Sequence, residues 1–133
     1  MRSIVLSVAT LVLGLTAFTG SASANTTAAQ CEAMLGDVAG AREALASLEQ
    51  SLVDVDAERV ELVAAIASVE KKIAKAKGHA MLSLRAELDG LTVELNLVDE
   101  LRPELVRQIE GLRTDIDATE RGYISCIETV IAG

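Results

Sequence analysis

Hydrophobic residues recur along residues 31–76 at alternating steps of three and four positions. One polar residue, Arg59, interrupts this first stripe. Its members are Cys31, Met34, Val38, Ala41, Leu45, Leu48, Leu52, Val55, Arg59, Leu62, Ile66, Val69, Ile73 and Ala76. A hydrophobic position every 3.5 residues on average keeps one face of a helix turned toward a partner helix, as in a coiled coil. The pattern predicts a long helix from about residue 28 to about residue 77.

A second stripe with the same steps follows over residues 81–126. Its members are Met81, Leu84, Leu88, Leu91, Leu95, Val98, Arg102, Leu105, Ile109, Leu112, Ile116, Thr119, Tyr123 and Cys126. The two stripes are mirror images in phase, because the residue numbers of facing pairs, such as Leu45 with Leu112, always add up to 157. This phase is the one that antiparallel packing needs. The second stripe therefore predicts a helix over about residues 80–127 that folds back along the first.

A short basic segment containing Gly78 separates the two stripes. Glycine commonly ends a helix in the left-handed conformation, and lysines in the last turns favour the negative end of the helix dipole. We therefore predict a turn at about residues 78–79 and an all-α fold, a long antiparallel two-helix coiled-coil hairpin. Thr27 and Gln30 match the capping box that opens helices. Pro103 lacks a backbone donor, so a kink is expected near it, and the alternative fold is a three-helix bundle broken at Pro103.

Residues 1–24 differ in pattern from the rest of the chain. Arg2 precedes an uncharged run over residues 4–18, and an Ala-Ser-Ala sequence follows that ends at Ala24. A positive start, a short apolar core and an Ala-x-Ala end are typical of a secretory signal peptide. We predict cleavage near Ala24, export to the periplasm or the extracellular space, and a helical hairpin domain at residues 25–133. An uncleaved membrane anchor is the competing interpretation, although the run is shorter than the roughly 20 residues of a membrane span.

The chain has two cysteines, Cys31 and Cys126, which are the first member of one stripe and the last member of the other. In the mirrored register they face each other at the open end of the hairpin, and an oxidising compartment permits a disulfide. We predict this disulfide; an intermolecular bridge or two free thiols are the alternatives. Two cysteines and one distant histidine do not make up the tetrahedral ligand set of a zinc site.

Arg59 and Arg102 occupy neighbouring layers of the predicted seam, next to Pro103. A polar residue in a coiled-coil seam fixes the register at some cost in stability, and an arginine can lay its stem on the seam while its head reaches water. This structural interpretation is favoured. The alternative is a functional waist or hinge formed by Arg59, Arg102 and Pro103.

Charge is distributed unevenly along the predicted mature chain. The segment from Lys71 to Arg85 holds five bases and no acid, whereas both flanking segments are strongly acidic. The candidate contact residues of this tip are Lys71, Lys72, Lys75, Lys77, His79 and Arg85. Lysines at the end of the first helix compensate its dipole, and this interpretation competes with contact between the tip and an anionic surface, such as a membrane or an acidic protein. Dipole compensation explains Arg85 less well, and His79 is interpreted as a turn residue.

A second, weaker apolar set lies on the first helix outside the seam. It comprises Val53, Val60, Val63 and Ala67. Two helices alone bury only part of their apolar surface, so this set favours self-association of two hairpins into a homodimer.

Several classes of function are disfavoured by the residues themselves. The acidic shaft and the lack of aromatic residues near the tip argue against nucleic acid as a partner. The cysteines and the histidine fall at opposite ends of the rod, and carboxylates on a hairpin line a solvated face rather than a pocket that shifts their pKa. We therefore predict no enzyme activity, no cofactor or metal, and no small-molecule substrate. The favoured function is an exported structural spacer or protein-interaction module. The alternative is an envelope-associated binding or chaperone-like module that uses the basic tip.

Overall fold

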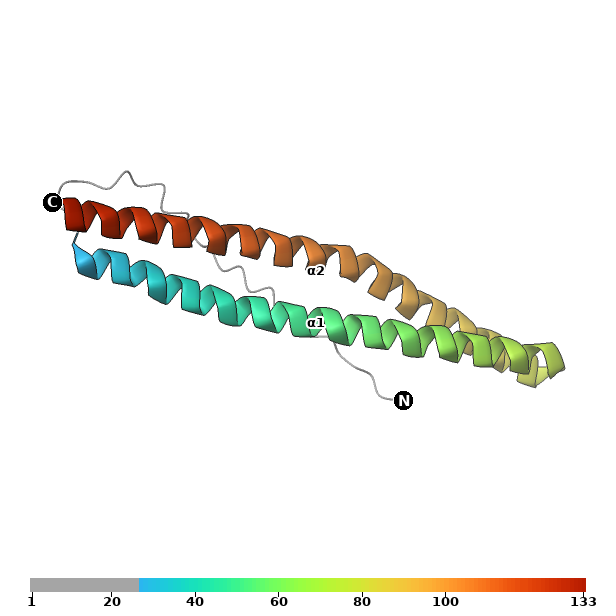
Figure 1. The fold of residues 1–133 in the computed structure, drawn as a ribbon. Helices are drawn as coiled ribbons and strands as arrows, with labels where there is room; N and C mark the ends of the chain where they lie inside the picture. Colours follow the sequence, from blue (N-terminus) through green and yellow to red (C-terminus); the bar gives the residue numbers. More distant parts are fainter. Residues whose placement is uncertain (1–26) are drawn as a thin grey trace.

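Two long antiparallel helices make up the part of the chain that the computed structural model describes, residues 27–133. Helix α1 spans Ala28–Lys75 and helix α2 spans His79–Ala132, and they lie side by side along their length (Figure 1). The predicted all-α hairpin is confirmed. The predicted signal peptide and its cleavage site fall outside the described residues.

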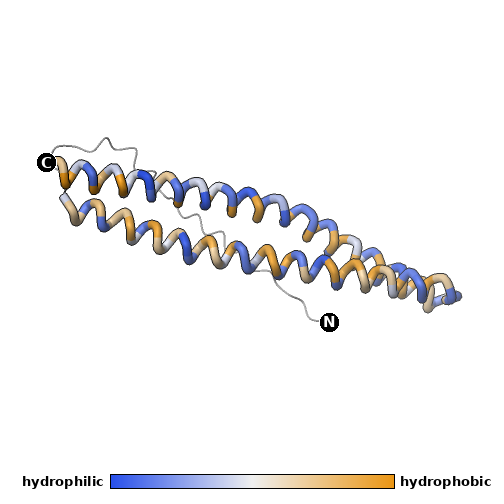
Figure 2. Tube along the Cα trace, in the orientation of Figure 1, coloured by the Kyte–Doolittle hydropathy of each residue, from blue (hydrophilic) through white to orange (hydrophobic). Residues whose placement is uncertain are grey.

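The buried side chains of the two helices all belong to the two predicted stripes. They are Cys31, Val38, Ala41, Val55, Leu62, Val69, Val98, Leu105, Ile109, Ile116 and Cys126. One cluster, nearer the base, joins Ala41 with Ile116, and Leu45 and Leu112 pack against it, as the mirrored register predicts. A second cluster around Val55 fills the middle of the rod. Figure 2 shows the hydrophobic positions recurring at short intervals along both helices.

The start of α1 is fixed by the predicted capping box. The Gln30 backbone N–H donates a hydrogen bond to Thr27 Oγ1 at 3.4 Å, and the Thr27 backbone N–H donates to Gln30 Oε1 at 2.9 Å. Two donors that the first helical turn leaves without a helical partner are satisfied in this way.

The turn between the helices occupies residues 76–78, slightly earlier than predicted, and His79 is the first residue of α2. Ala76 ends α1 in an extended conformation, so Gly78 is not the residue that terminates this helix. Gly78 instead precedes α2 with φ 63° and ψ −135°, a backbone conformation that residues other than glycine rarely adopt. At the other end, α2 continues five residues past the predicted end at residue 127, because no glycine or proline occurs between residue 127 and Gly133.

Helix α2 passes through Pro103 without interruption, so the three-helix alternative is wrong. Proline removes one helical hydrogen bond. Pro103 is exposed on the outer side of α2, where water can satisfy the carbonyl group that loses its partner. Figure 1 shows α2 bending near its middle as one unbroken ribbon.

Candidate functional site: the waist, the basic tip and the disulfide base

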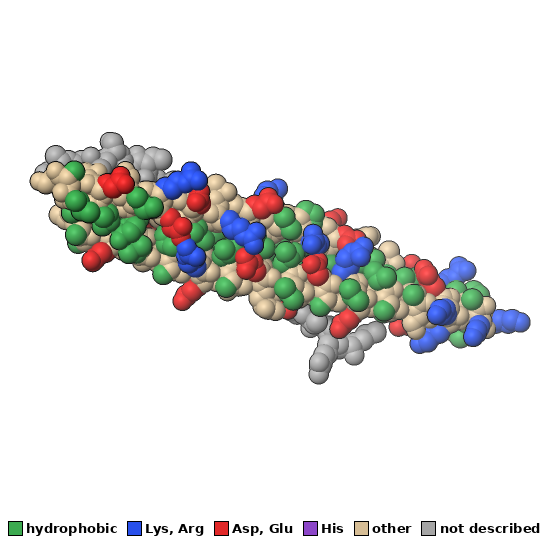
Figure 3. All heavy atoms as spheres, viewed as in Figure 1, with side chains coloured by type: hydrophobic (Ala, Val, Ile, Leu, Met, Phe, Trp, Pro, Cys, Tyr) green, Lys and Arg blue, Asp and Glu red, His purple; other side chains and the backbone are tan. Residues whose placement is uncertain are grey.

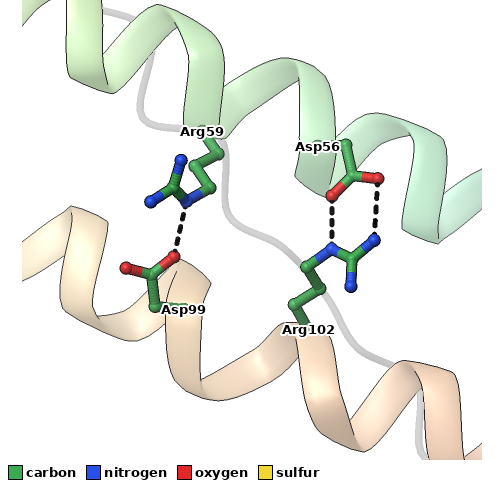
Figure 4. Close-up of polar contacts among 4 residues, drawn as sticks. All are labelled: Asp56, Arg59, Asp99 and Arg102. Atoms are coloured by element: carbon green, nitrogen blue, oxygen red, sulfur yellow. Dashed lines mark hydrogen bonds and ion pairs between the residues drawn. The ribbon is translucent and has the colours of Figure 1, made fainter.

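Two arginine–aspartate pairs cross between the helices at the middle of the rod (Figure 4). Arg59 Nε of α1 donates a hydrogen bond to Asp99 Oδ1 of α2 at 2.7 Å. In the opposite direction, Arg102 Nε of α2 donates to Asp56 Oδ1 of α1 at 2.7 Å, and a second guanidinium nitrogen donates to Asp56 Oδ2 at 3.4 Å. Each arginine of the seam is therefore neutralised by an acid of the other helix.

The guanidinium groups of these arginines lie at the surface, while the valines opposite them in the seam are shielded from solvent. The side chains of Arg59 and Arg102 are 47% and 46% exposed, but Val55 and Val98, which face them in the mirrored register, are 0% and 4% exposed. The arginine stems thus cover apolar seam positions. A shift of one helix by a heptad would separate both pairs, so the waist specifies the register. Both helices run through the waist unbroken, and its role as a hinge stays a prediction.

The bidentate pair changes the acidity of its members. The hydrogen bond from Arg102 is the main cause that holds the pKa of Asp56 below its ordinary value, and the charges of Arg102 and Arg59 act in the same direction. The hydrogen bond to Asp56 likewise raises the pKa of Arg102. Charge-assisted hydrogen bonds favour the charged form of both groups, so the pair is fully ionised at neutral pH.

Two further ion pairs link the helices between the waist and the base. Arg113 bonds to Glu49 at 2.9 Å, and Arg42 bonds to Glu120. Sequence reasoning missed this ladder. Its signal was present, because an arginine precedes a glutamate by seven residues on each helix, and antiparallel packing sets each arginine against the glutamate of the other helix.

The basic side chains of the tip differ from those of the shaft in whether they form ion pairs. All six shaft arginines of the described residues take part in ion pairs: Arg42, Arg59, Arg102, Arg107, Arg113 and Arg121. Across residues 27–133, no ion pair involves Lys71, Lys72, Lys75, Lys77 or Arg85. Figure 3 shows their blue side chains gathered at the end of the rod, away from the mixed red and blue of the shaft. The tip therefore presents five unneutralised positive charges.

Two other side chains complete the tip. His79 is exposed at the start of α2. Leu82, one turn further along, is 66% exposed, so an apolar side chain stands among the bases. Sequence reasoning passed over Leu82, although the second stripe, which includes Met81 and Leu84, already left Leu82 outside the seam.

The predicted disulfide joins Cys31 of α1 to Cys126 of α2 at the base. Their Cα atoms are 5.7 Å apart, within the usual range for a disulfide. Cys31 is 0% exposed and Cys126 is 8% exposed, so the bridge is shielded from solvent. Both cysteines of the chain are used, in place of the alternative intermolecular bridge or free thiols.

Over residues 27–133, no cluster of three histidine, cysteine or acidic side chains is placed to hold a metal ion. Neither of the two described helices contains a stretch long and apolar enough to span a membrane. Comparison of the chain with protein-family models, curated proteins and solved structures found no match.

Proposed function

We propose that this chain is an exported coiled-coil hairpin that acts as a structural spacer or protein-interaction module. The observation that supports this proposal best is the continuous seam, which is closed at the base by a disulfide and pinned at the waist by reciprocal ion pairs. Helix α1 has 48 residues, which correspond to about 72 Å at 1.5 Å per residue. Such a rod holds its two ends at a fixed separation.

Export is supported by two independent features. The sequence of residues 1–24 has the pattern of a secretory signal. The disulfide suits an oxidising compartment, because cytosolic thiols are kept reduced. The periplasm or the extracellular space is therefore the proposed location.

Export is tested by expressing the full chain in a secreting host and recording the intact mass of the exported product. The expected product begins at Asn25 and is two mass units lighter than after reduction. A variant in which Ala22 and Ala24 are both changed to Leu should keep its first 24 residues. Recovery of the full-length, reduced chain from the cytoplasm would refute export.

The spacer role is tested by spin labels placed on α1 on either side of the waist, at Ser47 and Ser68, two exposed serines. They are 21 residues apart, so a rigid helix gives one narrow distance near 32 Å. Labels at Ser47 of α1 and Thr114 of α2 report the packing across the seam. Broad distributions from the disulfide-bonded chain would contradict a rigid spacer.

A second candidate function is contact between the basic tip and an anionic surface. The contrast between the ion-paired arginines of the shaft and the tip side chains without ion pairs favours this function. Helix-dipole compensation accounts for Lys72 and Lys75 in the last turn of α1. It does not account for Lys77 in the turn, or for Arg85 and the exposed Leu82 on α2. Anionic lipid attracts lysines near a surface by about 1 kcal/mol each, and an exposed leucine can enter the headgroup region. A chaperone-like module that holds acidic proteins would use the same bases.

The tip is tested by co-sedimentation with vesicles of phosphatidylglycerol and phosphatidylcholine. Replacing Lys71, Lys72, Lys75 and Lys77 with Gln should lower the apparent affinity by about 100-fold or more at low salt. The matched control removes the same number of positive charges from the shaft, by changing Arg42, Arg107, Arg113 and Arg121 to Gln. Binding that falls equally in both variants, or in neither, would exclude the tip as a specific contact.

A further inference from the structure

Helix α1 carries a second apolar stripe on the side that faces away from α2. It consists of Val53, Ala57, Val60, Ala64 and Ala67, spaced by alternating steps of four and three residues, and we name it the outer stripe. All five residues are exposed, with Val53 at 59% and Val60 at 69%. Val63, at 43%, lies beside it. The spacing is that of a coiled-coil seam without its partner helix.

Helix α2 also exposes apolar side chains among its described residues. Its large exposed hydrophobic side chains are Leu82, Val93, Leu97, Ile124 and Ile131. Of these, Leu82, Val93 and Leu97 lie with Ala86 on one exposed face near the tip, at spacings of four, seven and four residues, whereas Ile124 and Ile131 lie near the base. Exposed apolar surface is therefore present on both helices, and the choice of α1 rests on the charges at the two ends of its outer stripe.

Opposite charges stand at the two ends of the outer stripe. Continued by the same steps, the stripe passes Gln50 and Ala46 to Glu43 at one end, and reaches Lys71 at the other. Glu43 lies 14 residues before Ala57, and Lys71 lies 14 residues after it. Both are exposed, and neither takes part in an ion pair over residues 27–133.

This symmetry identifies the occupant of the stripe as a second copy of the chain. A twofold axis beside Ala57 brings Glu43 of each copy opposite Lys71 of the other copy. The outer stripe is centred on Val60, so the two apolar stretches overlap over residues 53–61, and Ala64 and Ala67 lie opposite the region of Ser47 and Gln50. Parallel pairing would instead set Glu43 against Glu43 and Lys71 against Lys71, and would bring the two basic tips together. Ala57, Ala64 and Ala67 have small side chains, which allow two helices to approach closely.

We propose that two copies of the chain pair antiparallel through the outer stripe of α1, with two ion pairs between Glu43 of one copy and Lys71 of the other. This pairing names a partner for the interaction role proposed above and rests on it. The contact runs along about 42 Å of each helix but is only about one helix face wide. It is smaller than a standard stable interface, so the dimer dissociates in the micromolar range.

The proposal is tested by sedimentation equilibrium of the disulfide-bonded mature chain from about 5 to about 500 µM. A monomer–dimer equilibrium is expected, and Val60→Glu should remove it, because each copy would place an unpaired carboxylate in the apolar contact. The control is Val93→Glu, at a similarly exposed valine of α2 (58%), which should leave the equilibrium unchanged. A chain that stays monomeric over the whole range overturns the proposal, and so does equal weakening by both variants.

Charge reversal tests the antiparallel direction. Glu43→Lys and Lys71→Glu should each raise the dissociation constant by about tenfold at low salt, since each replaces two attractions with two repulsions. The double variant restores opposite charges and should return the constant to the original value within about twofold. Additive weakening in the double variant refutes the antiparallel pairing.

Lys71 also belongs to the tip, so the two roles are separated by a variant outside it. Val60→Glu keeps all five tip bases, and its vesicle binding measures tip contact in a monomeric chain. If the wild-type chain is monomeric and still binds vesicles, the dimer fails and the tip function stands. If a dimer forms and Val60→Glu does not bind vesicles, the tip function fails and the dimer stands.

Discussion

The disulfide at the base should supply a large share of the stability of the hairpin. It links residues separated by 95 positions. On the chain-entropy model, closing a loop of that length stabilises the folded state by about 4–5 kcal/mol, by restricting the unfolded chain. Residual structure in the unfolded chain reduces this figure, so we expect a measured difference of about 3–5 kcal/mol. That is a large part of the 5–15 kcal/mol typical of small domains.

The measurement is urea unfolding followed by far-ultraviolet circular dichroism, with the oxidised chain compared with Cys31→Ala/Cys126→Ala. The variant leaves no polar group at Cys31, which is fully buried. The reduced wild-type chain is the control, because it keeps both sulfur atoms and lacks only the bond between them. If both uncrosslinked forms lie within about 1 kcal/mol of the oxidised chain, the covalent closure contributes little and the packed seam alone holds the rods together.

Three further predictions concern single residues. Gly78→Ala should destabilise the hairpin by about 1–3 kcal/mol in urea unfolding, because Gly78 has a positive φ that strains a residue with a Cβ. Nothing lies within 4 Å of the added Cβ, so backbone strain rather than a clash is the cause. Gly111→Ala, the same change inside α2 and likewise in open space, should stabilise it by about 0.5–1 kcal/mol; equal signs would contradict the turn geometry. Asp56→Asn should destabilise the chain at neutral pH. Because the pKa of Asp56 is lowered on folding from 3.8, its stabilising effect is present above that pH and is lost as the pH falls through the lowered value, so unfolding curves of the two proteins should converge in acid. Thr27→Ala removes one hydrogen bond of the capping box and should cost about 1 kcal/mol, with faster amide exchange confined to the first turns of α1.

The hairpin fold was predictable from the sequence, because the packing of two helices along a rod is encoded in one spacing of hydrophobic residues, every 3.5 positions on average. Each buried residue lies on a stripe that can be read without coordinates, and the phase of the two stripes implies the register. The capping box around Thr27 is local and was found for the same reason. The end of α1 was less accurate, because several residues near Gly78 could end a helix and local sequence does not rank them.

The surface contacts were harder to predict than the seam. That Asp99 and Asp56 lie near the seam arginines was evident, but the reciprocal pairing depends on how each guanidinium leaves the seam. Whether acidic side chains lie within reach of the tip lysines also depends on the three-dimensional arrangement of the two helices. A lysine such as Lys72 can reach several positions on either helix, and sequence spacing alone does not say which acids lie within range.

In the proposed antiparallel dimer, self-association and tip contact would exclude each other. With the twofold axis beside Ala57, the tip of each copy lies about 30 Å from the centre of the dimer, whereas the base of the other copy reaches about 43 Å. The acidic disulfide end of each hairpin therefore extends past the basic tip of the other copy, beside Lys77 and Arg85. It would repel the anionic surface that the tip attracts. A dimer of this kind holds its tips covered until dilution or a competing anionic surface separates the copies. Monomeric Val60→Glu should then bind vesicles at least as tightly as the wild-type chain at concentrations where the latter is paired, which follows only if the same tip serves one contact at a time.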